Sequence, residues 1–209
     1  MRIDLWTDPA SPDCTQVPEV LGAALARFGA TVEVVEHAFE VDRQAPVERR
    51  SFDAQRVIAL ARREGGPELE ARVRATLVRA HHDDGAALGD HEVLTSLAEG
   101  AGLDRAVVEA LLASDDLGYE VRADEATARM IGVEKVPTFV FDRKFALSGP
   151  QPVEALLVGL ATAAEQADAQ AEPGRTAVIE AVVAHSDRPG FARIGGVGAA
   201  LRPIMRLGC

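Results

Sequence analysis

The chain has 209 residues, 47% of them hydrophobic, and a formal net charge of −11 from 22 basic and 33 acidic side chains. This length and composition suffice for one sizeable hydrophobic core, and the negative charge argues against nucleic acid or an anionic membrane surface as a partner. Without an apolar run of 18 residues or a secretory leader in the first residues, we expect a cytoplasmic protein with no membrane span.

The first elements along the chain form a predicted βαβ unit. Alternating apolar residues predict a strand over residues 2–7, and an apolar stripe predicts a helix that begins near Pro12 and stops at Gly29. The valine-rich segment 31–39 predicts a second strand. Short connections between strand, helix and strand indicate that the two strands are parallel.

Residues 46–131 have an almost wholly helical pattern. The sequence Gly65-Gly66-Pro67 separates two predicted helices. Asp90 and Asp104 are the predicted N-caps of two more helices. A further helix is predicted over residues 119–131.

The remaining elements are a predicted hairpin and a helix. Residues 138–142 and 145–147 predict two short strands joined by a tight turn, and Pro152 opens an amphipathic helix. The composition then changes, and the glycine-rich segment 169–209 stays unassigned. Its apolar positions near the end leave a homodimer open: Leu201, Ile204, Met205 and Leu207.

Several segments resemble one known family. Ile3 to Cys14, Ser51 to Arg56 and Val136 to Pro152 resemble the FrnE-like branch of the DsbA-like thioredoxin-fold family. The resemblance covers about residues 1–168 and implies an α/β, thioredoxin-like fold (βαβ and ββα) with an inserted all-helical lobe. It implies three parts: a thioredoxin-like domain of residues 1–45 and 132–168, an inserted helical domain of residues 46–131, and a C-terminal extension of residues 169–209.

The candidate catalytic residues depart from the family pattern. The family has Cys-x-x-Cys where this sequence has Ser11-Pro12-Asp13-Cys14. A helix N-terminus stabilises a thiolate and lowers its pKa, but a serine hydroxyl is too weak an acid to ionise there. We therefore expect no dithiol exchange by Ser11 and Cys14.

Two interpretations of Ser11 stay open. It is either the helix N-cap, with Pro12 at the first helical position, or a hydrogen-bond donor to the sulfur of a bound thiol. A Ser-Pro loop also resembles kappa-class glutathione transferases and 2-hydroxychromene-2-carboxylate isomerases. That resemblance implies glutathione or mycothiol as a co-substrate.

Cys14 also has more than one interpretation. It is a small apolar core residue, or it forms a mixed disulfide with a cellular thiol, or it is the redox partner of Cys209, the only other cysteine.

Further residues are candidates for binding a substrate. The resemblance implies a cis bond before Pro137 that exposes the backbone of Val136. The other candidates flank the loop or lie in it: Trp6, Asp8, Pro12 and Asp13. We predict no metal site, because the adjacent His81 and His82 point in different directions on a helix and favour a solvated helix end.

The leading functional hypothesis is a DsbA-family thiol oxidoreductase homologue with a degenerate site, acting on a small molecule or peptide. One alternative is a glutathione- or mycothiol-dependent isomerase or transferase that uses Ser11. The other is a non-catalytic binding or chaperone-like module.

Overall fold

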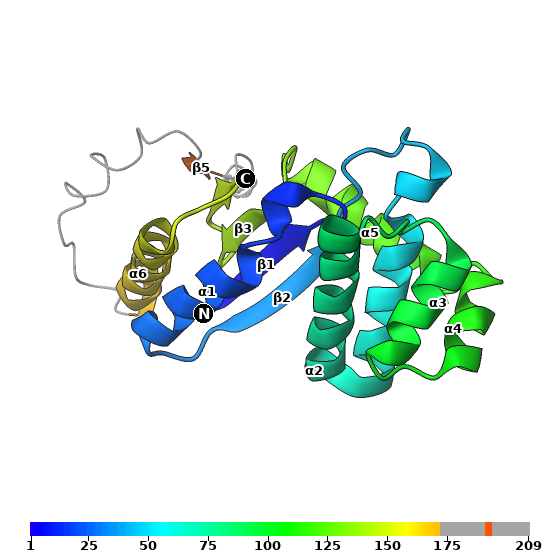
Figure 1. Cartoon of the computed structure of the whole chain (residues 1–209). Helices are drawn as coiled ribbons and strands as arrows, with labels where there is room; N and C mark the ends of the chain where they lie inside the picture. Colours follow the sequence, from blue (N-terminus) through cyan, green and yellow to red (C-terminus); the bar gives the residue numbers. More distant parts are fainter. Residues whose placement is uncertain (172–190, 194–209) are drawn as a thin grey trace, which may run out of the picture.

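The computed structural model describes residues 1–171 and 191–193, which include one five-stranded sheet in the order β2-β1-β3-β4-β5 (Figure 1). The strand β1 (Arg2–Thr7) lies between β2 (Glu33–Ala38), to which it is parallel, and β3 (Thr138–Phe141), to which it is antiparallel. The antiparallel strands β4 (Phe145–Ser148) and β5 (Phe191–Arg193) extend the sheet beyond β3. The parallel β1–β2 pair and the β3–β4 hairpin are confirmed, whereas β5 was not predicted.

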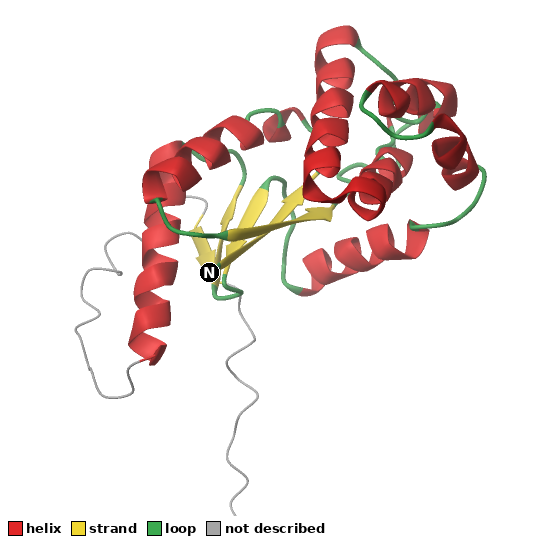
Figure 2. Cartoon of the chain, turned by 90° about the horizontal axis from the view of Figure 1, so that it is seen from below, coloured by secondary structure: helices red, strands yellow, loops and turns green. Residues whose placement is uncertain are grey.

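Helices cover both faces of this sheet (Figure 2). The helices α1 (Val17–Phe28) and α6 (Val153–Ala171) pack together on one face, and α5 (Gly118–Met130) packs against β2 on the other. This is the thioredoxin-like arrangement of βαβ and ββα units that the sequence predicts.

The helical insertion lies between β2 and β3. It contains α2 (Phe52–Asp84), α3 (His91–Gly100) and α4 (Arg105–Leu112) and ends with α5. Gly66, at φ 70° and ψ −166°, interrupts α2, which confirms the predicted break between two helices. The carboxylates of Asp90 and Asp104 accept hydrogen bonds from backbone amides of α3 and α4, so both predicted N-caps are confirmed.

The start of the first helix differs from the prediction. Instead of one helix from Pro12, a short 3₁₀ helix, η1 (Pro12–Cys14), is followed by a turn, and α1 begins only at Val17. Pro18 has no backbone N–H and cannot donate to the carbonyl of Cys14, which a continuous α-helix would require. A second 3₁₀ turn, η2 (Val47–Arg49), lies in the loop between β2 and α2.

Two hydrophobic clusters hold the described residues together. One surrounds the sheet and includes Cys14, Phe139 and Leu156, and the other joins α2, α3 and α4 around Leu60 and Leu94. Ala128 of α5 belongs to the cluster around the sheet. The domain boundaries themselves stay a prediction.

Candidate functional site

The site is built where β1 ends, beside α2. The carbonyl of Thr7 accepts a hydrogen bond from Gln55 Nε2 at 2.9 Å, and Thr7 Oγ1 accepts one from Arg74 Nη1 at 3.0 Å. Both donors come from α2. The inserted helical segment therefore fixes the point at which the loop leaves the sheet.

Asp8 anchors the loop itself. Its carboxylate accepts hydrogen bonds from the amides of Ala10 at 2.9 Å and Val41 at 2.8 Å, and its carbonyl accepts one from the Ser11 amide at 3.0 Å. Only 2% of Asp8 is exposed, and this burial raises the pKa of its carboxyl. Asp8 thus orients the loop.

Ser11 occupies the N-cap position of η1 but does not act as a cap. Its backbone is extended, at φ −84° and ψ 124°, and its side chain makes no capping hydrogen bond. The half-buried residue lines a cavity of about 460 Å³, which we call the Ser11 cavity. The other residues around it come from the same loop, the β2–α2 loop and the end of α2: Asp8, Ala10, Pro12, Val41, Asp42, Ala45, Arg49, Ser51 and His81.

Cys14 is buried, with 5% of its surface exposed. Burial raises the pKa of its thiol to about 12, an effect larger than the opposing hydrogen bonds from the Asp8 backbone and the Ser11 side chain. A thiol with this pKa is protonated near neutral pH and is a poor nucleophile.

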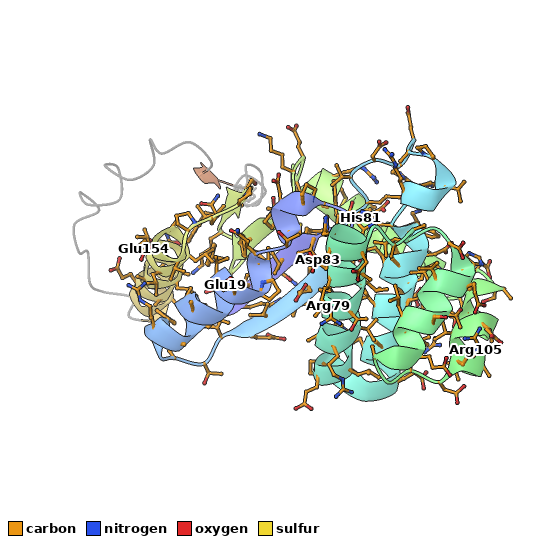
Figure 3. All side chains as sticks on the ribbon, in the orientation of Figure 1. Glu19, Arg79, His81, Asp83, Arg105 and Glu154 are labelled. Atoms are coloured by element: carbon orange, nitrogen blue, oxygen red, sulfur yellow. The ribbon has the colours of Figure 1, made fainter. Side chains whose placement is uncertain are left out.

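Cys14 lines a second cavity, of about 370 Å³, which lies between α1 and α2 and which we call the Cys14 cavity. Its walls include Val17 and Leu21 of α1 and Val78 of α2, and Arg79 and Asp83 add charge (Figure 3). Neither cavity contains both Ser11 and Cys14 among its lining residues.

The bond between Val136 and Pro137 is cis, as the resemblance implies. Because Trp6 pairs with Thr138 in antiparallel register, Val136 and Pro137 reach the same end of the sheet as the loop after β1. The expected exposure of the Val136 backbone is wrong, however. Val136 is 3% exposed, since it packs in the same hydrophobic cluster as Trp6, and neither Val136 nor Pro137 lines the Ser11 or the Cys14 cavity.

The remaining predicted binding residues are divided between core and surface. Trp6 is 2% exposed, and its Nε1 donates to the carbonyl of Asp124 at 3.2 Å, so it lies in the core. Pro12 lines the Ser11 cavity, whereas the exposed Asp13 lines neither cavity. Cys209 and the apolar positions proposed for a homodimer lie outside the described residues.

Two histidines that the sequence analysis considered only for a metal site lie beside the loop. His81 and His82 are half-buried, and the Nε2 atom of His82 lies 3.1 Å from the carbonyl oxygen of Pro9. The predicted solvated helix end holds for the exposed Asp83 and Asp84, whereas the two histidines pack against the loop. The only sequence signal is that the pair lies one turn before the C-capping Gly85. Within the described part of the chain, no group of three or more His, Cys, Asp or Glu side chains could hold a metal.

A charged network joins β1, β2 and α5 through Asp4, His37 and Asp124. The two ring nitrogens of His37 each lie 2.9 Å from a carboxylate oxygen, one of Asp4 and one of Asp124. Burial alone would lower the pKa of His37, but the two carboxylates outweigh it and the pKa is raised. Burial likewise raises the pKa of Asp4, yet Arg2 and His37 together lower it below its usual value.

Comparison with known proteins places the fold. A family model described as a DSBA-like thioredoxin domain matches residues 2–161, and a model described as a domain of unknown function matches residues 156–209. Among solved structures, a probable DsbA oxidoreductase from Streptomyces coelicolor is similar, with a TM-score of 0.72 and 28% identity, over 87% of this chain and 94% of that one. No curated protein matches the chain.

Two more distant structures share the fold. A putative protein disulfide isomerase from Nitrosomonas europaea has a TM-score of 0.63 and 16% identity, over 79% of this chain and 98% of that one. The cytosolic disulfide reductase DsbM from Pseudomonas aeruginosa, solved with GSH, has a TM-score of 0.55 and 17% identity, over 82% and 100% of the two chains. None of the described helices has the length and apolar character that crossing a membrane requires.

Proposed function

The chain belongs to the DSBA-like thioredoxin domain family, and from this membership we propose that it carries out thiol-dependent chemistry on a small molecule or peptide with a degenerate site. In this proposal the nucleophilic sulfur does not belong to the protein. It belongs to a low-molecular-weight thiol, glutathione or mycothiol, that binds beside Ser11.

One observation carries this proposal: the only sulfur in the loop is buried and its thiol pKa is raised to about 12. Dithiol exchange needs a thiolate that can reach its substrate. Cys14 does not meet this requirement, and Ser11 cannot ionise in its place. Within the described residues, thiol chemistry at this loop therefore needs a sulfur other than that of Cys14, and we propose that a bound thiol supplies it.

Features of the Ser11 cavity support the proposal that the sulfur of the bound thiol lies there. The Ser11 hydroxyl is not engaged as a helix cap, and its hydrogen bond within the loop goes to Cys14. In the proposal a bound thiol takes the place of Cys14 as its partner, and Arg49 brings a positive charge to the same cavity. A hydroxyl donor and a nearby cation both favour the ionised form of a thiol. A distant neighbour in fold was solved with GSH, which makes reduced glutathione the first probe to use.

Calorimetric titration with reduced glutathione and with mycothiol tests the proposal. We expect one of them to bind the wild-type chain, and Ser11→Ala to weaken that binding. The control is Ser96→Ala, which removes an exposed hydroxyl from α3. Absence of binding by both thiols would contradict the proposal.

Cys14→Ser separates two versions of the reaction. If a bound thiol is the nucleophile, as in an isomerase or transferase, binding and turnover should persist in this variant. If Cys14 instead forms a mixed disulfide with that thiol, turnover should be abolished. The raised pKa of Cys14 favours the first outcome.

A non-catalytic binding module is the second candidate, and the protonated state of Cys14 also favours it. This alternative predicts binding of peptides or apolar molecules with no binding of either thiol. A cytoplasmic location is part of the main proposal, because a reducing compartment supplies low-molecular-weight thiols and keeps Cys14 reduced.

A further inference from the structure

We propose that His81 accepts the proton of the thiol bound beside Ser11, an inference that rests on the proposed function. His81 belongs to the last turn of α2, far from Ser11 in sequence, and it lines the same cavity. Figure 3 shows His81 at the end of α2 next to the loop that follows β1. A base at this place would face a thiol held by the Ser11 hydroxyl.

The hydrogen bonding of His81 leaves one ring nitrogen able to take a proton. Its Nδ1 lies 2.8 Å from the carbonyl oxygen of Ala86. A carbonyl oxygen only accepts, so Nδ1 must carry the hydrogen of this bond. In the neutral ring Nε2 then has a free lone pair, and a neutral imidazole is a suitable base near neutral pH.

The neighbouring His82 does not share this role. Its Nε2 lies 3.1 Å from the carbonyl oxygen of Pro9 and therefore carries the hydrogen of that bond. Its ring meets the ring of His81 edge to face at 4.8 Å, but it lines the Cys14 cavity, not the Ser11 cavity. The two histidines thus provide a test and its control.

The charged groups that share the Ser11 cavity with His81 are of both signs. Asp8 and Asp42 line the cavity, and so does Arg49, whose positive charge favours a negative sulfur. His82 is the titratable ring in direct contact with His81. The thiolate formed by the transfer therefore has a cation in the same cavity.

The step is a proton transfer without a change of oxidation state. The S–H bond of the bound thiol breaks, its proton forms a bond to His81 Nε2, and the electron pair stays on sulfur. The thiolate then accepts a hydrogen bond from the Ser11 hydroxyl. Return of the proton from His81 regenerates the starting state.

Two substitutions preserve the structural hydrogen bonds while removing the rings. In His81→Asn the side-chain amide takes the place of Nδ1 and can still donate to Ala86, but no base remains. In His82→Gln the amide takes the place of Nε2 and can still donate to Pro9.

The measurement is the pH dependence of alkylation of bound glutathione by iodoacetamide, with protein in excess over the thiol. Mycothiol replaces glutathione if only mycothiol binds.

We expect His81→Asn to bind the thiol as the wild type does, while alkylation near neutral pH slows by roughly 10²-fold, the usual contribution of a general base. His82→Gln should behave as the wild type. In the wild type, nitrogen NMR should show His81 Nε2 becoming protonated when the thiol is added, a readout that does not depend on how the variant folds.

Retained binding with an unchanged pH profile in His81→Asn would overturn the role of His81 alone. An equal loss in His82→Gln would also overturn it, because the effect would then belong to the end of α2 as a whole. Failure of the wild type to bind either thiol would overturn the proposed function, and this inference with it.

Discussion

Ser11 and Cys14 stand three positions apart, yet they line two different cavities. Asp8 lines both cavities; Asp42 and Arg49 add charge to the Ser11 cavity, and the Cys14 cavity combines charged residues with apolar side chains of α1 and α2. The residue that cannot ionise is only half-buried, whereas the one that could ionise is held protonated by burial. The difference teaches that the one sulfur in the loop is kept from acting as a nucleophile by its burial.

The largest expected effect comes from Ser11→Cys, which places a sulfur in the Ser11 cavity. A cysteine of ordinary pKa is about a few per cent thiolate near pH 7, whereas a serine hydroxyl is not ionised. We expect disulfide exchange with a model peptide to rise from the background rate to a clearly measurable one. The rate of reduction of a fluorescent disulfide peptide is the measurement.

A further variant serves as the control for this gain. In a Cys209→Ser background, Ser11→Cys combined with Cys14→Ser leaves the new thiol without a resolving cysteine and should stop at a mixed disulfide with the peptide. If Ser11→Cys alone gave no gain, the loop would lack the remaining features of a redox site, and the non-catalytic module would be favoured.

The sequence predicted the fold better than the state of the site. Alternation over residues 2–7 and the break at Gly66 arise from local patterns, so strand and helices could be foreseen. The protonation of Cys14 depends on its burial in the hydrophobic cluster around the sheet, and the Ser11 cavity depends on Arg49 and His81, which approach only in the folded chain. A local motif specifies which atoms are present, but not the packing that sets their exposure and pKa.

The second prediction tests whether burial makes the Cys14 thiol unreactive. In a Cys209→Ser background, where Cys14 is the only thiol, iodoacetamide should label the native chain far more slowly than the denatured chain. With a native pKa of about 12, alkylation near pH 8 should be roughly 10³-fold slower than for an unfolded cysteine. Similar rates of alkylation in the two states would show that Cys14 can act as a nucleophile in the native chain.

Asp8 lines both cavities, so Asp8→Asn tests how much its hydrogen bonds stabilise the loop between them. One carboxylate oxygen accepts from Ala10 and the other from Val41, and an amide can replace only one of these acceptors. We expect the free energy of unfolding to fall by about 1–3 kcal/mol, measured by urea denaturation. Asp13→Asn, at an exposed position outside both cavities, is the matched control and should have little effect.

We expect the smallest effect from a substitution of His37, which lies on β2, contacts Asp4 and Asp124, and lines neither cavity. The substitution His37→Gln removes a ring that two carboxylates hold in its charged form. Hydrogen bonds to charged groups contribute about 1.5–3 kcal/mol, but Asp4 keeps its contact with Arg2, so we expect a loss near or below the lower end of that range. The control is His91→Gln, where an exposed ring pairs with Asp53 and a surface pair contributes little.

The pH dependence of this loss has a definite sign. The pKa of His37 is raised from an ordinary value of 6.5, so its stabilisation is fully present below about pH 6.5 and is lost as the pH rises through the raised pKa. The pKa of Asp4 is lowered from 3.8, so its share is present above that value and is lost on acidification. The difference in unfolding free energy between wild type and His37→Gln should therefore be greatest between these two values. Urea titrations across this range that gave a constant difference, or one growing toward high pH, would contradict a charged His37. At any one pH, His37→Gln should bind the thiol at Ser11 as the wild type does.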